Sequence, residues 1–210
     1  MFDNLTKQEK AIFKKYNTPQ KIQDFINTIP NNFEPDGDTC RSPRVVLATN
    51  TAHCIEGALL AAAILAYHGH KPLLLDLTAT KHDFDHVVTP FQINGLWGAI
   101  SKTNHAVLRY REPIYKTIRE LVLSYFHEYF LDDGTKTLRS YAGPFNLTNF
   151  ETRDWITTKE TLWEIPNTLV ELKHIPLFPR GAEKRFRKAD KIERDAGKLT
   201  EWPAKLLGKS

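Results

Sequence analysis

The sequence predicts an α+β domain in which a buried central helix packs on an antiparallel sheet, with further helices added around this core. The first observation is a run from Cys54 to Tyr67 in which Glu56 is the one charged residue. A helix that is apolar on every side must be buried on every side. The second observation is the pair Asn94-Gly95 between two strand-like runs, the strongest short-range signal for a β-hairpin. Helix, strand, hairpin and helix in this order favour the α+β class.

Two segments before the central helix have recognisable patterns. Residues 6–28 place apolar side chains at helical spacing, and Pro19 breaks this helical run. Residues 30–43 are rich in Pro, Asn, Asp and Gly and are predicted to form a loop. Asn50 or Thr51 is suited to cap the start of the central helix, and Gly69 is suited to the left-handed position after its end.

The segments after the central helix predict a strand, a hairpin and two helices. Residues 71–79 are expected to form a buried strand, residues 85–103 the hairpin, and residues 114–130 a second helix. The motif Thr157-x-x-Glu160 is typical of a capping box for a shorter helix, which Pro166 interrupts or ends. Residues 131–179 carry apolar anchors without a motif, so the sequence leaves open whether they wrap the core or cover a groove.

Composition indicates one domain, residues 1–179, followed by a basic C-terminal tail, residues 180–210. The tail has ten Lys and Arg against five Asp and Glu, a net charge of +5, whereas the whole chain carries +4. Acidic residues are interleaved with the basic ones, which favours a solvated helix over a nucleic-acid-binding segment. With two cysteines, no signal sequence and no apolar run long enough to cross a membrane, a cytoplasmic protein is expected.

The hairpin fixes which side chains can meet. A two-residue turn at Asn94-Gly95 makes the numbers of paired residues sum to 189, which places Thr103 opposite His86 and Ser101 diagonally beside it on the same face. Either residue could place a hydroxyl near one ring nitrogen of His86. Asp85 points to the opposite face and is rejected as a partner of His86. The core face is expected to carry Val87, Phe91, Ile93, Leu96 and Ile100. The other face, suited to lining a groove, carries His86, Val88, Gln92, Trp97, Ala99 and Ser101.

Cys54 is the candidate nucleophile. At the first turn of a helix, the dipole and the unpaired backbone N–H groups favour the thiolate, and those N–H groups can also bind an oxyanion. His86 within reach would complete a Cys-His pair for acyl transfer, with Ser101 holding the imidazole ring. The alternative for Cys54 is a structural residue of the core.

Metal and cofactor chemistry find little support in the sequence. His82 and His86 have the spacing of two ligands on one helix face, but the segment is predicted to be a strand, where that geometry fails. Cys40 lies in a polar loop and is predicted to be a free or partly buried thiol rather than a second nucleophile. No Gly-rich phosphate-binding loop is present, and no cofactor is expected.

The segments CIEGALLAAAIL, DHVVTPF and LWGAIS together resemble the transglutaminase-like superfamily of papain-related enzymes. The resemblance covers residues 18–130 and extends to bacterial proteins of that superfamily whose function is not known. It implies a nucleophilic cysteine at the start of the central helix, a histidine on the next strand and an aspartate at the end of the second hairpin strand. By position it assigns the first two roles to Cys54 and His86.

One departure from the superfamily pattern concerns the third member. Ser101 stands where the aspartate would align, and a serine cannot stabilise an imidazolium by charge. Asn104 is an alternative orienting residue if the strand ends early. Two functions are therefore predicted. The first is a thiol-dependent enzyme, a cysteine peptidase, amidase or transglutaminase-like acyltransferase acting on a peptide, amide or ester; the second is a catalytically impaired binding module that uses its basic tail.

Overall fold

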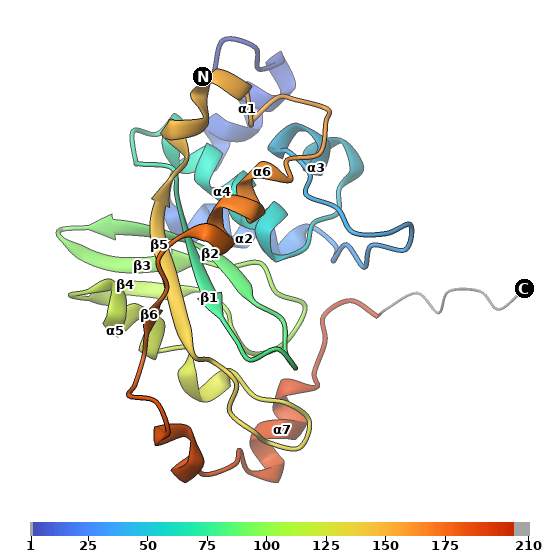
Figure 1. The fold of residues 1–210 in the computed structure, drawn as a ribbon. Coiled ribbons are helices and arrows are strands. Elements are labelled where there is room, and N and C mark those ends of the chain that lie inside the picture. The colour runs from blue at the N-terminus through green and yellow to red at the C-terminus, as the bar shows by residue number, and fades with distance from the viewer. Residues whose placement is uncertain (1, 204–210) are drawn as a thin grey trace, which may run out of the picture.

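The computed structural model describes residues 2–203 and confirms the α+β class. Within these residues one antiparallel sheet has the strand order β4-β3-β2-β1-β5-β6 (Figure 1). The strands are β1 (Leu73–Thr78), β2 (His86–Ile93), β3 (Leu96–Ile100), β4 (Arg111–Tyr115), β5 (Ser140–Asn146) and β6 (Ile175–Pro176).

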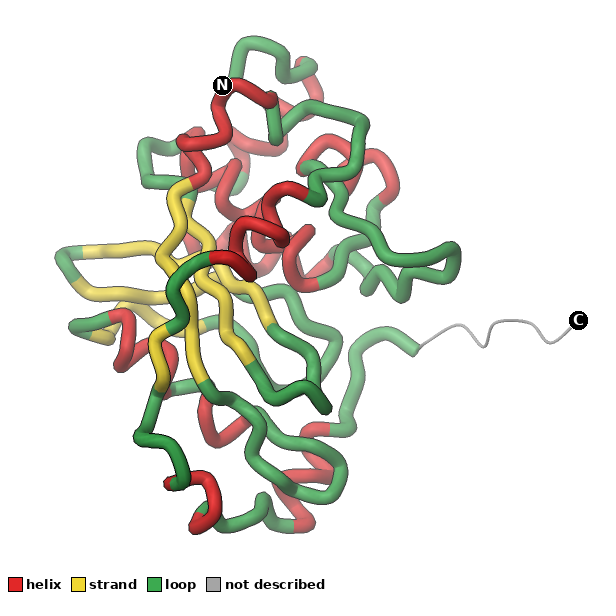
Figure 2. The backbone as a smooth tube through the Cα atoms, in the orientation of Figure 1, coloured by secondary structure: helices red, strands yellow, loops and turns green. Residues whose placement is uncertain are grey.

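Helices and helical turns surround the sheet, and the tube in Figure 2 shows a larger group of them at the top of the view and a smaller group at the bottom. The α-helices are α1 (Lys7–Lys15), α2 (Pro19–Thr28), α3 (Pro43–Thr49), α4 (Cys54–Tyr67), α5 (Ile118–Leu123), α6 (Glu164–Glu171) and α7 (Lys191–Gly197). Single 3-10 segments are η1 (Phe126–Glu128), η2 (Leu147–Arg153) and η3 (Ala182–Arg185). Within the described residues, no helix is both long and apolar enough to cross a membrane.

The predicted buried helix is α4, and its position defines the main core. All residues from Ile55 to Leu65 are buried, among them the charged Glu56. α1, α2, α3 and α6 pack with α4 against one face of the sheet, which presents Leu74 from β1. The next residue, Leu75, points to the opposite face and belongs to a second core under α5 and η1. Alternate residues of a strand therefore supply two cores, which covers the sheet on both faces.

The hairpin has the predicted register from the turn to its last pair, since Gln92 pairs with Trp97 and Thr89 with Ile100. β3 ends at Ile100, so the predicted pairing of Thr103 with His86 is not formed. The expected groove on the face of His86 is only partly present. Val88 and Ala99 from that face are buried in the second core, because α5 and η1 pack over them. On the same face Gln92 is exposed and Trp97 half-buried near the turn, whereas His86 and Ser101 at the other end are buried. The prediction of which side chains share a face of the strand was correct, but the packing of α5 and η1 over that face was not predicted.

Three expectations about helices are wrong. Residues 111–115 form strand β4 on the edge of β3, so the helix predicted for 114–130 is reduced to α5 and η1. α4 begins after His53, and Asn50 instead ends α3 in the left-handed conformation. The motif at Thr157 does not start a helix, because Thr157 is bound in a turn to Asp154. Pro166 lies in the first turn of α6, where its missing N–H costs nothing.

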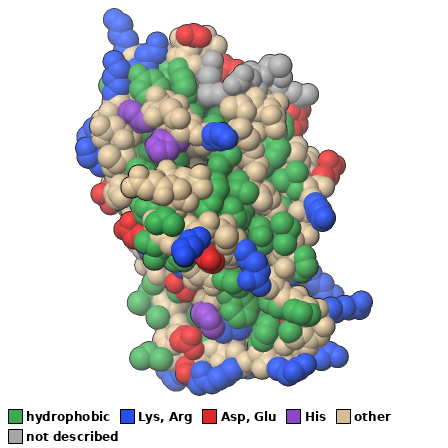
Figure 3. Space-filling view, turned by 90° about the vertical axis from the view of Figure 1, so that its left-hand side faces the viewer, with side chains coloured by type: hydrophobic (Ala, Val, Ile, Leu, Met, Phe, Trp, Pro, Cys, Tyr) green, Lys and Arg blue, Asp and Glu red, His purple; other side chains and the backbone are tan. Residues whose placement is uncertain are grey.

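The described part of the tail folds back onto the body. The Ala189 N–H donates to the Gly134 carbonyl at 2.8 Å, and Lys188 pairs with Asp133 at 2.6 Å. Its basic side chains around η3 stay exposed, and Figure 3 shows Lys and Arg gathered along the bottom of the molecule. The predicted tail therefore includes a docked segment, 180–203, and residues 204–210, which lie outside the described residues.

Candidate active site

Cys54 and His86 line one pocket. Cys54 is the first residue of α4, and His86 is the first residue of β2. The pocket has a volume of about 490 Å³ and receives further walls from residues 102–108, 128–132 and the tail around α7. Phe84, 90% exposed, stands at its rim. The candidate nucleophile and base thus line the same cavity.

His86 is held by Ser101 through a chain of directed hydrogen bonds. The His86 Nε2 lies 2.8 Å from the Ser101 Oγ, and the Ser101 hydroxyl donates to the Leu108 carbonyl at 2.5 Å. Because a carbonyl can only accept, the serine proton is committed to Leu108, and Ser101 must accept the proton of Nε2. This arrangement places the proton of neutral His86 on Nε2 and leaves Nδ1 as its basic nitrogen.

Leu108, whose carbonyl accepts the hydrogen bond from Ser101, has an uncommon backbone conformation. Leu108 has φ of 60°, a left-handed value that branched residues rarely adopt. Its N–H donates to the Glu128 carboxylate at 2.7 Å, so both the N–H and the carbonyl of Leu108 are hydrogen-bonded. The direction of the Ser101 hydroxyl is therefore fixed, and its oxygen is left to accept from His86.

The two other residues considered for orienting His86 have different partners. The Asn104 side chain bonds the backbone of Trp202 twice, once as donor and once as acceptor, both at 2.9 Å. Asp85 accepts from the Ala79 N–H at 2.7 Å. The choice between Ser101 and Asn104 is resolved in favour of Ser101 by these contacts.

His53 is a second imidazole at Cys54 that the sequence reasoning did not single out. Its Nδ1 lies 4.0 Å from the Cys54 Sγ, and its Nε2 donates to the Thr39 carbonyl at 2.9 Å. Two carboxylates also face Nε2, that of Glu34 at 3.3 Å and that of Glu56 at 3.6 Å. The pattern His-Cys-x-Glu around the helix start is the one signal that could have drawn attention to it.

The surroundings of Cys54 favour its thiolate. Burial by itself would raise the pKa of Cys54, but hydrogen bonds and charges from His53 and His86 outweigh it and lower the pKa to about 5. Burial likewise works against the charged form of His53, whereas the Cys54 thiolate and Glu56 raise the pKa of His53 to about 9. At neutral pH these shifts favour a thiolate next to an imidazolium.

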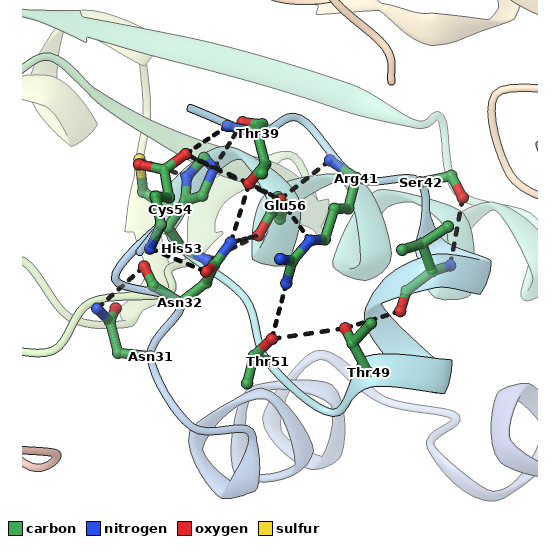
Figure 4. A network of polar contacts seen from close by, with 12 residues as sticks. Asn31, Asn32, Thr39, Arg41, Ser42, Thr49, Thr51, His53, Cys54 and Glu56 are labelled. Carbon is green, nitrogen blue, oxygen red and sulfur yellow. Dashed lines mark hydrogen bonds and ion pairs between the residues drawn. The ribbon is translucent and has the colours of Figure 1, made fainter. Parts of the chain in front are cut away.

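Glu56 ties the loop before the site to the helix that carries Cys54. Its buried carboxylate accepts from the Thr39 hydroxyl at 2.7 Å, the Arg41 N–H at 3.0 Å and the His53 N–H at 3.1 Å. The Asn32 amide donates to it at 3.1 Å. Figure 4 shows these groups converging on Glu56 beside Cys54. These hydrogen bonds position the loop at Thr39, whose carbonyl in turn accepts from the His53 ring.

Lys102 brings a buried cation to the wall of the pocket. Its Nζ donates to the Ile29 carbonyl at 2.6 Å, and burial lowers the pKa of Lys102 to about 8. Its stem crosses α4 at Gly57, where an added Cβ would come within 2.4 Å of the Lys102 Cβ. The glycine is therefore required by this close crossing near the start of α4.

The tail stabilises the loop that carries Ser101 and Leu108. Besides the Asn104–Trp202 pair, the Ala106 N–H donates to the Leu199 carbonyl at 3.0 Å, and the Glu201 N–H donates to the Asn104 carbonyl at 2.9 Å. The tail thus forms a wall of the pocket and supports the segment that orients His86.

We expect a chain ending at Lys198 to have a free energy of unfolding about 2 kcal/mol or more below that of the full chain, because the hydrogen bonds from residues 199–202 to the loop are lost. A chain ending at Pro203 keeps every tail contact described above and is the matched control. Urea unfolding of both chains checks this. Equal free energies of unfolding for the two truncated chains would contradict a supporting role of residues 199–203.

Within residues 2–203, no group of three or more His, Cys, Asp and Glu is arranged to hold a metal ion. No protein-family model and no curated protein shows significant similarity to this sequence. The interpretation of the site therefore depends on its own geometry and chemistry.

Proposed function

We propose that the protein is a thiol-dependent acyl-transfer enzyme with a papain- or transglutaminase-like core. Cys54 is the nucleophile, His86 the general base and acid, and Ser101 the residue that orients His86. The observation that carries the proposal is the acceptor chain from His86 through Ser101 to Leu108, because it leaves a basic nitrogen available in the pocket that holds Cys54. Support for the core comes from a cysteine at the start of a buried helix and a histidine on the hairpin packed against that helix.

The proposed reaction has two balanced halves. The Cys54 thiolate attacks the carbonyl carbon of an amide or ester, a C–S bond forms, and the oxyanion is bound by N–H groups at the first turn of α4. Its collapse breaks the bond to the leaving group, which takes up a proton that His86 delivers from solvent. In the second half a water or amine gives its proton to His86 and attacks the thioester, which breaks the C–S bond and restores the thiolate; His86 then releases this proton to solvent.

The alternative function, an impaired module that binds through its tail, has the missing carboxylate as its main support. Ser101 removes the charge that would stabilise an imidazolium, but its committed proton still fixes the tautomer of His86. The docked residues of the tail contact the loop at Asn104 and His105. These inward contacts favour the enzyme, in which the tail has a structural role.

Thiol labelling tests the proposal, with the second cysteine as an internal control. Cys40 is fully buried, and burial raises its pKa to about 12, so it should not react. We expect iodoacetamide to modify Cys54 rapidly at pH 6 to 7, and modification to disappear in Cys54→Ala but persist in Cys40→Ala. Reaction of Cys54 only above pH 8, as for an ordinary thiol, would overturn the proposal.

A further inference from the structure

The thiolate of Cys54 has two histidine neighbours with unlike surroundings. His86 is bonded through Nε2 to the neutral hydroxyl of Ser101. His53 is bonded through Nε2 to the Thr39 carbonyl and faces the carboxylates of Glu34 and Glu56 with the same nitrogen. A carboxylate stabilises an imidazolium by charge, whereas a hydroxyl does not. The proton that makes a histidine cationic is therefore favoured on His53.

Several neighbours hold His53 in place. The Thr39 carbonyl fixes one ring nitrogen, and the backbone N–H of His53 donates to Glu56 at 3.1 Å. Glu34 is itself held, because the Thr39 N–H donates to it at 2.6 Å. The ring consequently cannot turn away from Cys54 without breaking these contacts, and Nδ1 remains directed at the sulfur.

We infer that His53 is a positioning residue whose fixed imidazolium holds Cys54 as a thiolate, so that Nδ1 of His86 is left to accept the proton of the second nucleophile. This inference rests on the proposed function. In a simple Cys-His pair, one histidine must both stabilise the thiolate and transfer protons. Here the two tasks are divided between two histidines that both interact with the sulfur.

The titratable and charged groups around this pair come from several elements. Towards His53 these are Glu34, Arg41, Cys54 and Glu56, and Arg41 lies 3.8 Å from Glu56. Towards Cys54 the electrostatic neighbours are Cys40, His53, His86 and Tyr129. Burial raises the pKa of Cys40 to about 12 and also raises that of Tyr129, so both are neutral near pH 7. The charge state of the Cys54 thiol therefore depends on Glu34, Glu56, Arg41 and the two imidazoles.

The test is the pH dependence of Cys54 alkylation in the full-length protein with Cys40→Ala as background. In this background we expect Cys54 to titrate with a pKa of about 5. His53→Gln keeps a donor for the Thr39 carbonyl but cannot carry the charge. We expect it to raise the pKa of Cys54 by at least about one unit, which lowers the alkylation rate at pH 5 by about fivefold or more. His68→Gln, at the other end of α4, is the matched control and should leave the titration unchanged.

Glu34→Gln keeps the inference falsifiable if His53→Gln does not fold. It retains an acceptor for Thr39 and removes one charge from beside His53 without touching Cys54, so a smaller upward shift is expected. A titration of Cys54 that neither variant moves overturns the role of His53 and leaves the proposed function intact. An ordinary thiol titration near pH 8.5 in the background protein overturns both.

Discussion

Replacing His86 with glutamine is expected to slow acyl transfer by about 10²- to 10⁴-fold, the contribution of a positioned general base. Glutamine can still donate to Ser101 but has no basic nitrogen to accept a proton from water or an amine. For an ester that acylates Cys54 rapidly, the decrease should appear mainly in kcat. Hydrolysis of the thioester is then the rate-limiting step, and this step requires the base. Steady-state hydrolysis of a nitrophenyl ester measures the effect.

Two further variants make the His86 result specific. His127 is exposed, and His127→Gln should retain the wild-type rate. Ser101→Ala should give an intermediate loss, because the Nε2 proton of His86 loses its acceptor and the tautomer is no longer fixed. A His86→Gln rate within about threefold of wild type would show that His86 is not the base, given the size that this role requires.

Replacing Glu56 with alanine is expected to lower the free energy of unfolding by about 3 kcal/mol or more, the cost of breaking a buried charged network. The variant leaves donors from Thr39, Arg41 and His53 without their acceptor inside the protein. Glu56→Gln keeps an acceptor oxygen and should lose less. Urea unfolding followed by Trp fluorescence provides the measurement.

The matched control for Glu56 is an exposed glutamate at the end of α6. Glu171→Ala should change the free energy of unfolding by less than about 0.5 kcal/mol, as is usual for surface positions. Equal unfolding midpoints for Glu56→Ala and wild type would mean that the loop around Thr39 is not held by this carboxylate. The position of His53 would then need another explanation.

The part of the site formed by the hairpin could be predicted from the sequence, because it follows from local rules. The turn residues Asn94-Gly95 set the register, and the alternation of a strand places His86 and Ser101 on one face. The ladder ends at Thr89 and Ile100, and beyond it Ser101 lies 2.8 Å from His86 on the predicted face, where Gln23 and Leu108 also hold it. The apolar run of α4 also needed no long-range information, since burial on all sides can be read from composition alone.

The parts that could not be predicted depend on contacts between distant segments. The position of the His53 ring depends on its hydrogen bond to the carbonyl of a loop residue, Thr39. Thr39 is in turn held against α4 by its hydrogen bond to Glu56. β5 contains Gly143 and Pro144, which are turn signals in a sequence although here they lie in a strand beside β1. The tail looked like a solvated basic segment, because backbone hydrogen bonds such as that from Ala106 to Leu199 leave no trace in side-chain composition.

The central claim is that Cys54 carries an acyl group which His86 helps to remove. Its most direct measurement is the mass of the intact protein after mixing with nitrophenyl acetate, followed over time. The account predicts one acetyl group on Cys54, none in Cys54→Ala, and loss of that group at least about 100-fold more slowly in His86→Gln than in wild type. Absence of the acetyl group from Cys54, or equal rates of its loss in the two proteins, would contradict the account.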